Sequence, residues 1–181
     1  MADNNEERME KTIASLKDSF NGIRTGRASA AMFDKVFVDY YGTKSPLNQV
    51  STIAIPEARS VIITPFDKTL IGEIEKAIQA ANLGLNPSND GKVIRIQVPA
   101  LTADRRKELV KQAKTVAENS RTAIRNIRRD GNDAFKKMQK DGELTEDGLK
   151  TETDKLQKLT DKYIEEINKI YDSKEKDILQ N

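Results

Sequence analysis

Arginine side chains recur at helical spacing in one stretch of this 181-residue sequence. Arg121, Arg125 and Arg128 stand at positions i, i+4 and i+7, so a helix would carry them in one stripe, which also includes Lys114 and Asn132. A guanidinium group matches the geometry of a phosphate better than an ammonium group does. The spacing therefore predicts a surface that binds the phosphate backbone of RNA.

The competing interpretation is a solvated helix face whose cations pair with acids of the same protein. Glu118 is the one acidic residue within the stripe. Like charges at these spacings repel each other by about 0.2–0.5 kcal/mol per pair in an isolated helix, and an anionic partner would replace that repulsion with attraction. The stripe therefore favours an RNA contact over a purely solvated face.

Arg24 and Arg27 form a second basic pair within residues 23–29, where the first helix is expected to end. They can extend the RNA-binding surface. They can equally mark a helix C-terminus, because Gly26 between them suits a helix cap and cations complement the helix dipole there. The residues alone leave both interpretations open.

The sequence contains no Cys, no His and no Trp. Disulfides, thiolate nucleophiles, imidazole bases and Cys- or His-ligated metal sites are therefore excluded. No glycine-rich loop continues into Gly-Lys-Ser/Thr, and the segments 130–133 and 141–143 lack calcium ligands at alternate positions ahead of their glycines. We expect no metal, no cofactor and no catalytic residue, since an enzyme would have to work with carboxylates, Lys, Tyr or Ser alone.

The longest uninterrupted aliphatic run covers only residues 61–63, far short of the roughly 20 residues that a membrane-spanning helix needs. The N-terminus is acidic and polar, unlike a signal peptide. With the absence of Cys, these features predict a cytoplasmic protein without a membrane partner.

Charge is unevenly distributed along the chain, although the formal net charge is only +2. Residues 104–140 hold 12 basic and 5 acidic residues, whereas residues 141–181 hold 7 basic and 12 acidic ones. The distribution predicts a basic helix that lies beside an acidic one.

Three segments, 9–23, 109–138 and 149–178, have the apolar spacing of long amphipathic helices. Three such stripes can be buried only against one another, which predicts a three-helix bundle. Thr145 is expected to cap the third helix, which then returns antiparallel to the second. Gly131 lies inside the second helix at a cost of about 1 kcal/mol relative to Ala, so a neighbouring helix is expected to approach closely there.

Residues 29–103 contain all five prolines and most of the β-branched runs. Strands are predicted at 35–41, 52–55, 60–64 and 93–98. Between Pro65 and Gly84 the apolar spacing changes to three and four, which predicts one amphipathic helix after a cap at Asp67 or Thr69. Residues 86–91 have the composition of a turn.

These elements predict an α+β protein of two domains. Residues 1–28 and 104–181 would form an elongated antiparallel three-helix bundle, and residues 29–103 an inserted β/α/β domain. A helix over residues 103–139 would be about 55 Å long, which favours a rod that spans a partner. The two short chain crossings can act as a hinge, expected at Ala28, Ser29, Ala30, Leu101, Thr102 and Ala103.

Several short sequence motifs, spread over essentially the whole chain, occur in a characteristic order and spacing. They are Ile-Arg-Thr-Gly-Arg-Ala-Ser at 23–29, Val-Asp-Tyr-Tyr-Gly-Thr at 38–43 with Pro-Leu at 46–47, Asn-Leu-Gly-Leu-Asn-Pro at 82–87, Leu-Thr at 101–102 before Arg-Arg-Lys at 105–107, and Arg-Asn-Ile-Arg-Arg-Asp at 125–130 with Asn-Asp at 132–133. In this order and spacing, the sequence resembles the bacterial ribosome recycling factors. Local differences at Gly131 and residues 141–153 fall where no function is assigned.

That resemblance implies an L-shaped, transfer-RNA-like molecule that binds the post-termination ribosome and places its Arg-rich helix on large-subunit ribosomal RNA. Elongation factor G and GTP hydrolysis would then drive separation of the subunits and release of messenger and transfer RNA. By motif position, Arg128 is the first candidate for an RNA contact, with Arg125, Arg129, Arg24 and Arg27 beside it. The resemblance implies no active site in this chain and no DNA partner.

Two other classes of function remain open. A structural coiled-coil adaptor would use its apolar seams to bind other proteins and would self-associate, whereas three seams within one chain can satisfy each other and give a monomer. An enzyme centred in the middle domain would have neither His nor Cys nor a cofactor loop.

Overall fold

The computed structural model describes residues 2–180, which divide into two compact units. One unit contains the chain up to Ile23 together with Asp104–Gln180, and the other contains Arg24–Ala103. The first boundary falls earlier than the expected one after residue 28, because the first helix already ends at Asn21.

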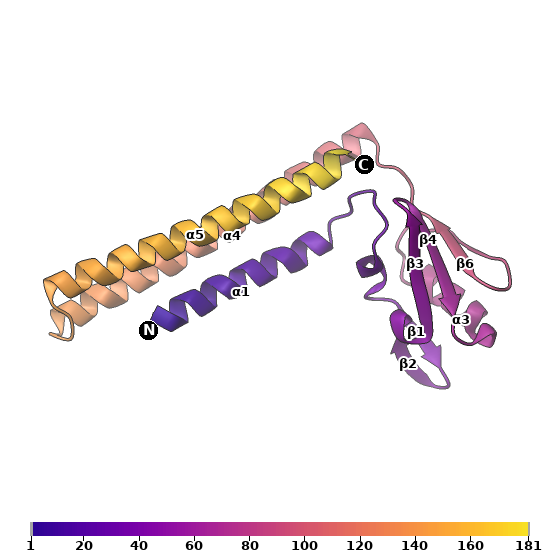
Figure 1. The fold of residues 1–181 in the computed structure, drawn as a ribbon, viewed down its shortest axis with the longest axis horizontal. Coiled ribbons are helices and arrows are strands. Elements are labelled where there is room, and N and C mark those ends of the chain that lie inside the picture. The colour runs from indigo at the N-terminus through magenta and orange to yellow at the C-terminus, as the bar shows by residue number, and fades with distance from the viewer. Residues whose placement is uncertain (1, 181) are drawn as a thin grey trace. The chain divides into compact units, whose positions relative to one another are not determined.

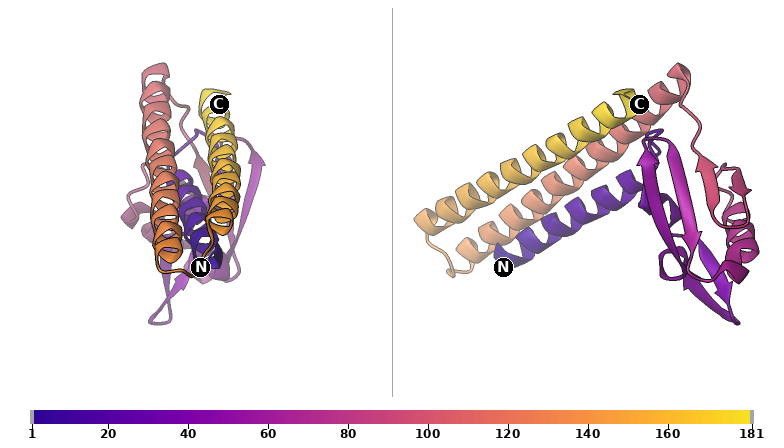
Figure 2. Two further views of the ribbon diagram at one scale, coloured as in Figure 1. Left: turned by 90° about the vertical axis from the view of Figure 1, so that its left-hand side faces the viewer. Right: turned by 45° about the vertical axis from the view of Figure 1, so that its right-hand side comes forward.

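The first unit is a bundle of three long helices, α1 (Ala2–Asn21), α4 (Ala103–Lys140) and α5 (Glu146–Gln180). They run side by side, and α4 runs opposite in direction to α1 and α5 (Figures 1 and 2). Thr145 caps α5 as predicted, since its Oγ1 accepts a hydrogen bond from the Gly148 amide at 2.9 Å. This unit confirms the predicted three-helix bundle.

The bundle core follows the predicted apolar positions closely on α1 and less closely on α4. The four predicted positions on α1 are buried, namely Met9, Ile13, Leu16 and Phe20, and so is the predicted Ile23, which follows the helix. On α4 the structure buries Ala117 and Phe135 and leaves the predicted Val116 and Ala134 half-buried. A heptad pattern drifts relative to the true repeat of about 3.6 residues, which explains these shifts by one position.

The second unit begins with a short 3₁₀ helix, η1 (Ala30–Phe33), and a two-stranded hairpin of β1 (Phe37–Tyr40) and β2 (Thr43–Pro46). Tyr41 and Gly42 connect the strands with φ angles of 49° and 83°. Two positive φ values are what a two-residue hairpin turn of this kind requires. The short helix α2 (Leu47–Val50) follows β2.

The remaining strands form an antiparallel sheet in the order β3-β4-β6-β5. They are β3 (Ser51–Glu57), β4 (Ser60–Pro65), β5 (Pro87–Asn89) and β6 (Ile94–Gln97). Between β4 and β5 the chain forms the 3₁₀ helix η2 (Lys68–Leu70) and the helix α3 (Ile71–Ala80). Val61, Ile63, Ile94 and Ile96 alternate inward from β4 and β6 and share one core with α3.

The four predicted strands and the predicted helix of this unit are present. The structure corrects residues 86–91, which contain β5 where a turn was expected, and adds β2 and α2. Both additional strands are polar and short, so they are held in place by pairing with a neighbour instead of by an apolar face of their own. Asp67 provides the expected cap, with its side chain accepting from the Thr69 amide, but it precedes η2 and not α3 directly.

No helix within residues 2–180 is long and apolar enough to cross a membrane.

Candidate nucleic-acid interface

The basic stripe lies on α4, but its members differ in how far they reach solvent. Lys114 and Arg125 are exposed, whereas Arg128 and Asn132 are half-buried. The side chain of Arg121 is 18% exposed, compared with 44% for that of Arg125. The stripe therefore contains two kinds of cation. Lys114 and Arg125 face solvent, whereas Arg121 and Arg128 are partly buried against the bundle.

Glu118 is the residue that restrains two of these arginines. Its carboxylate accepts a hydrogen bond from Arg121 at 2.9 Å and another from Arg125 at 3.2 Å. These two hydrogen bonds, with that from Arg121 the larger cause, lower the pKa of Glu118 below its ordinary value. The group is thus an ionised carboxylate bridging two guanidinium groups, which is also the arrangement that a phosphate would adopt there.

Polar side chains of α5 hold the buried side of the stripe. Arg121 Nε donates to Asn168 Oδ1 at 2.8 Å, and Arg128 Nη1 donates to Gln157 Oε1 at 3.5 Å. Gln157 in turn donates to Asp161 at 2.9 Å. The direct α5 partners are amides rather than carboxylates, so the positive charge of these arginines is oriented but not neutralised by α5.

Asn132 contributes differently from the arginines. Its amide oxygen is buried and accepts no hydrogen bond from the described residues. A phosphate oxygen cannot satisfy that group because both atoms are acceptors. Only the amide nitrogen of Asn132 can therefore donate to a phosphate.

Further exposed cations lie on the same side of α4. Arg129, Lys107, Lys111 and Lys136 are all exposed and fall within about 60° of Arg125 on a helical wheel. The prediction included Arg129 and omitted the three lysines. The sequence does identify these three lysines, because a helical wheel places them on the same side of α4 as Arg125. The prediction omitted them because it considered the spacing of the arginines.

The close approach of two neighbouring helices explains why α4 has a glycine at position 131. A Cβ atom added there would lie 2.6 Å from Leu156 Cδ2 of α5 and 2.9 Å from Asn5 Nδ2 of α1. The predicted close approach is therefore confirmed, with both neighbouring helices contributing.

Arg24 and Arg27 do not close the first helix, which ends at Asn21, so that expectation is wrong. Both residues follow the helix and belong to the second unit. The Arg24 guanidinium donates to the Leu83 carbonyl and packs beside Gly84. The structure thus assigns the Arg24 guanidinium a partner in its own unit.

The predicted hinge residues lie partly in regular structure. Ala30 is the first residue of η1, and Ala103 is the first residue of α4. The Ala28 amide donates to the Ala58 carbonyl at 2.7 Å, and the Val98 amide donates to the Arg59 carbonyl at 2.8 Å. Both crossings are thus bonded to the turn between β3 and β4, and residues 22–29 and 98–102 lack helix and strand.

Within the described residues, no group of three or more Asp or Glu side chains is arranged to hold a metal ion. The α4 surface therefore offers cations and amide donors rather than a coordination site. Its chemistry suits the binding of an extended anion.

Comparison with known proteins identifies the family of this chain. Residues 16–179 match the family model described as Ribosome recycling factor. The chain is 61% identical to the ribosome-recycling factor of Treponema denticola, over 98% of this chain and 96% of the relative. It is 57% identical to the Clostridioides difficile protein, over 97% of this chain and 95% of the relative.

Solved structures give the same result. A solution structure of the ribosome recycling factor superposes with a TM-score of 0.81 and 40% identity, covering 99% of this chain and 96% of that one. Models for the T. thermophilus ribosome recycling factor and the E. coli elongation factor G bound to the E. coli post-termination complex match with a TM-score of 0.66 and 40% identity, over 97% of this chain and 95% of that one. This chain therefore belongs to the ribosome recycling factor family.

Proposed function

We propose that this protein binds the post-termination ribosome and, together with elongation factor G and GTP hydrolysis, separates the subunits and releases messenger and transfer RNA. Family membership supports the proposal, as do the models for a similar factor and elongation factor G bound to the post-termination complex. The chain itself contributes no catalytic step, since the nucleotide chemistry belongs to the GTPase. It acts in the cytoplasm, as a monomer.

The observation that carries the RNA part of the proposal is the one-sided charge of α4. Lys114, Arg125 and Arg129 are exposed on one side, and the nearest acid on that side is Glu118. We assign this surface to large-subunit ribosomal RNA. Contacts of this kind hold a partner by its phosphates and fix its position without reading its sequence.

The two crossings give the second unit its proposed mechanical role. Residues 22–29 and 98–102 lack helix and strand, and each segment is held to the turn between β3 and β4 by one backbone hydrogen bond, from Ala28 to Ala58 and from Val98 to Arg59. We propose that motion between the units takes place within these two segments and that the GTPase uses it to drive subunit separation.

The deciding experiment is light scattering of post-termination ribosomes mixed with this protein, elongation factor G and GTP. We expect scattering to fall as subunits separate, and to remain constant with GDP in place of GTP. A protein with Lys111→Glu and Arg129→Glu, both at exposed positions of α4, is expected to keep its helix content and lose splitting activity. Full splitting by that variant would reject the α4 surface as the RNA contact.

A coiled-coil adaptor is the second candidate, because three long amphipathic helices can pair with other chains. In this structure Met9, Ile124 and Ile167, one from each helix, are fully buried within the same bundle. We therefore expect sedimentation to show a monomer over a wide concentration range. Concentration-dependent self-association would favour the adaptor instead.

A further inference from the structure

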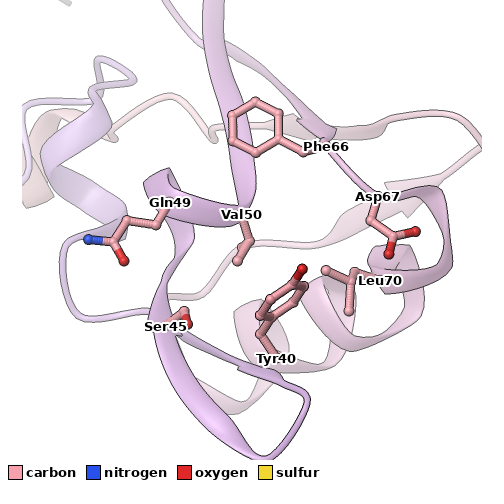
Figure 3. Close-up of a pocket in the computed structure, with 7 residues that line it drawn as sticks. All are labelled: Tyr40, Ser45, Gln49, Val50, Phe66, Asp67 and Leu70. Atoms are coloured by element: carbon pink, nitrogen blue, oxygen red, sulfur yellow. The ribbon is translucent and has the colours of Figure 1, made fainter.

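The second unit contains a pocket that the RNA-binding surface does not use. Seven residues line it: Tyr40, Ser45, Gln49, Val50, Phe66, Asp67 and Leu70. Figure 3 shows Tyr40 from the end of β1, and the consecutive residues Phe66 and Asp67 after β4, arranged around the side chains of Val50 and Leu70. The Gln49 amide points outward at the rim. Val50 and Leu70 are buried, so the pocket has an apolar floor and a partly polar wall.

Two aromatic rings remain exposed at this pocket although a sheet core lies beneath it. Phe66 is 68% exposed and Tyr40 is 39% exposed. Exposed aromatic rings around a small apolar pocket are typical of surfaces where a partner inserts a side chain. The feature therefore points to a binding role rather than to packing.

Asp67 gives the pocket its charge. Its Oδ1 atom accepts hydrogen bonds from the Thr69 amide at 3.0 Å and the Thr69 hydroxyl at 2.7 Å, and no bond to Oδ2 is formed by the described residues. The hydroxyl bond, followed by the amide bond, lowers the pKa of Asp67, so the carboxylate is ionised at neutral pH. None of the seven lining residues is a cation.

We propose that this pocket binds an arginine side chain presented by a protein partner. A planar guanidinium group stacks on aromatic faces and donates to a carboxylate, whereas its aliphatic stem packs on apolar surface. Phe66 and Tyr40 supply the rings, Asp67 Oδ2 supplies the acceptor, and Val50 with Leu70 supplies the apolar contact. This site is separate from the proposed RNA contact and does not depend on it.

A nucleobase is the competing occupant, because aromatic rings also stack on bases. Asp67 argues against it, since an ionised carboxylate repels the phosphates that accompany every base. Nucleic-acid pockets combine stacking rings with cations, and this lining contains none. The charge of the pocket therefore favours a cationic guest.

Titration of the ¹⁵N-labelled full-length protein with acetyl-arginine-N-methylamide tests the proposal directly. We expect amide signals of Phe66, Asp67 and Leu70 to shift in a saturable way. The neutral isostere acetyl-citrulline-N-methylamide should bind about tenfold more weakly, because it keeps the shape and loses the charge-assisted hydrogen bond. Guanosine monophosphate should leave these signals in place.

Four variants make the result specific. Asp67→Asn removes the charge and retains an acceptor for the Thr69 amide, and Phe66→Ala removes an exposed ring, so both should fold normally and lose arginine binding. Glu57→Gln and Phe37→Ala alter exposed residues of the same unit that do not line the pocket, and should bind as the parent does.

Three outcomes would each overturn the proposal. They are equal responses to the arginine and citrulline derivatives, unchanged binding by Asp67→Asn, and preferential shifts with guanosine monophosphate. None of these outcomes depends on ribosome splitting, which is scored separately.

Discussion

The carboxylate of Glu118 accepts a hydrogen bond from Arg125, seven residues further along α4, with 3.2 Å between Oε1 and Nη1. Its other oxygen accepts from Arg121 at 2.9 Å. Glu118 thus occupies the position between two guanidinium groups that a phosphate would take. An RNA backbone that binds at this point has to compete with it.

Glu118→Gln is therefore expected to strengthen ribosome binding, by about threefold, and to steepen its salt dependence, because a competing charge is removed. Filter binding at several salt concentrations measures both effects. Glu108→Gln is the matched control, since it makes the same charge change on α4 while its carboxylate pairs with Arg105 at 2.8 Å, outside the cluster. Weaker binding by Glu118→Gln would show that Glu118 positions the arginines and does not compete for them.

Arg129 and Arg128 are expected to respond differently to the same substitution. Arg129 is exposed, so Arg129→Glu should weaken ribosome binding with little change in thermal unfolding. Arg128 is half-buried and bonded to Gln157, so Arg128→Glu should also lower the free energy of unfolding by about 1 kcal/mol. The sequence predicted that Arg128 lies on the same surface as Arg125, and its half-buried position corrects that expectation.

Affinity measurements and circular dichroism melts of both arginine variants separate the two effects. Lys155→Glu on α5 is the control for charge, because Lys155 is exposed and pairs only loosely with Glu152 at 3.7 Å. An equal loss of affinity in all three proteins would indicate a general charge effect and no specific surface.

Gly131→Ala is expected to destabilise the bundle by about 1–2 kcal/mol. The new Cβ atom would lie 2.6 Å from Leu156 Cδ2, and the resulting overpacking outweighs the gain of up to about 1 kcal/mol in helix propensity. Gly72→Ala is the control, because apart from its chain neighbours and the backbone of its own helix no described atom lies within 4 Å of its Cβ position in α3, and it should be neutral or stabilising. Denaturant unfolding of the two variants checks the difference, and a stabilised Gly131→Ala would mean that α5 yields easily.

The buried phenol of Tyr163 is expected to limit alkaline stability. Burial, with the nearby Glu10 carboxylate as the next cause, raises the pKa of Tyr163 from 10.0 to about 12. As the pH rises from 10 toward 12, the unfolded chain releases this proton and the folded chain retains it, so the free energy of unfolding falls. Tyr163→Phe should lose less stability over that window, by roughly 1–3 kcal/mol.

Urea unfolding at about pH 9 and about pH 11.5 measures the difference between parent and variant. Tyr41→Phe serves as the control, since Tyr41 is 79% exposed in the hairpin turn. Parallel loss of stability in the parent and in Tyr163→Phe would exclude this tyrosine as a cause.

The sequence alone was sufficient to predict the long helices and the main strands, because the patterns that predict them involve residues close together in the chain. Apolar spacing is continuous along α1 and predicts its buried positions from Met9 to Phe20, as well as the buried Ile23 just after the helix. Thr145 was recognisable as a cap because its partner, the Gly148 amide, lies three residues away. Interactions over such short separations depend on the sequence between them and on little else.

Contacts between distant residues were decided only by the tertiary structure. Composition showed that α4 is basic, but not that Glu118 engages two of its arginines or that Gln157 holds Arg128 from another helix. The partner of Arg24, at Leu83, lies 59 residues away. Which of many distant residues becomes the hydrogen-bond partner of an arginine depends on how the elements pack. Helical periodicity in the sequence does not predict that packing.

The sequence therefore determined which segments form helices and strands, and which face of α4 is basic. The tertiary structure decided which of those cations remain free to meet an anion. It also brought Tyr40, Phe66 and Asp67 around one pocket. The physical reason is that periodicity depends on neighbours along the chain, whereas burial and charge pairing depend on residues that become neighbours only after folding.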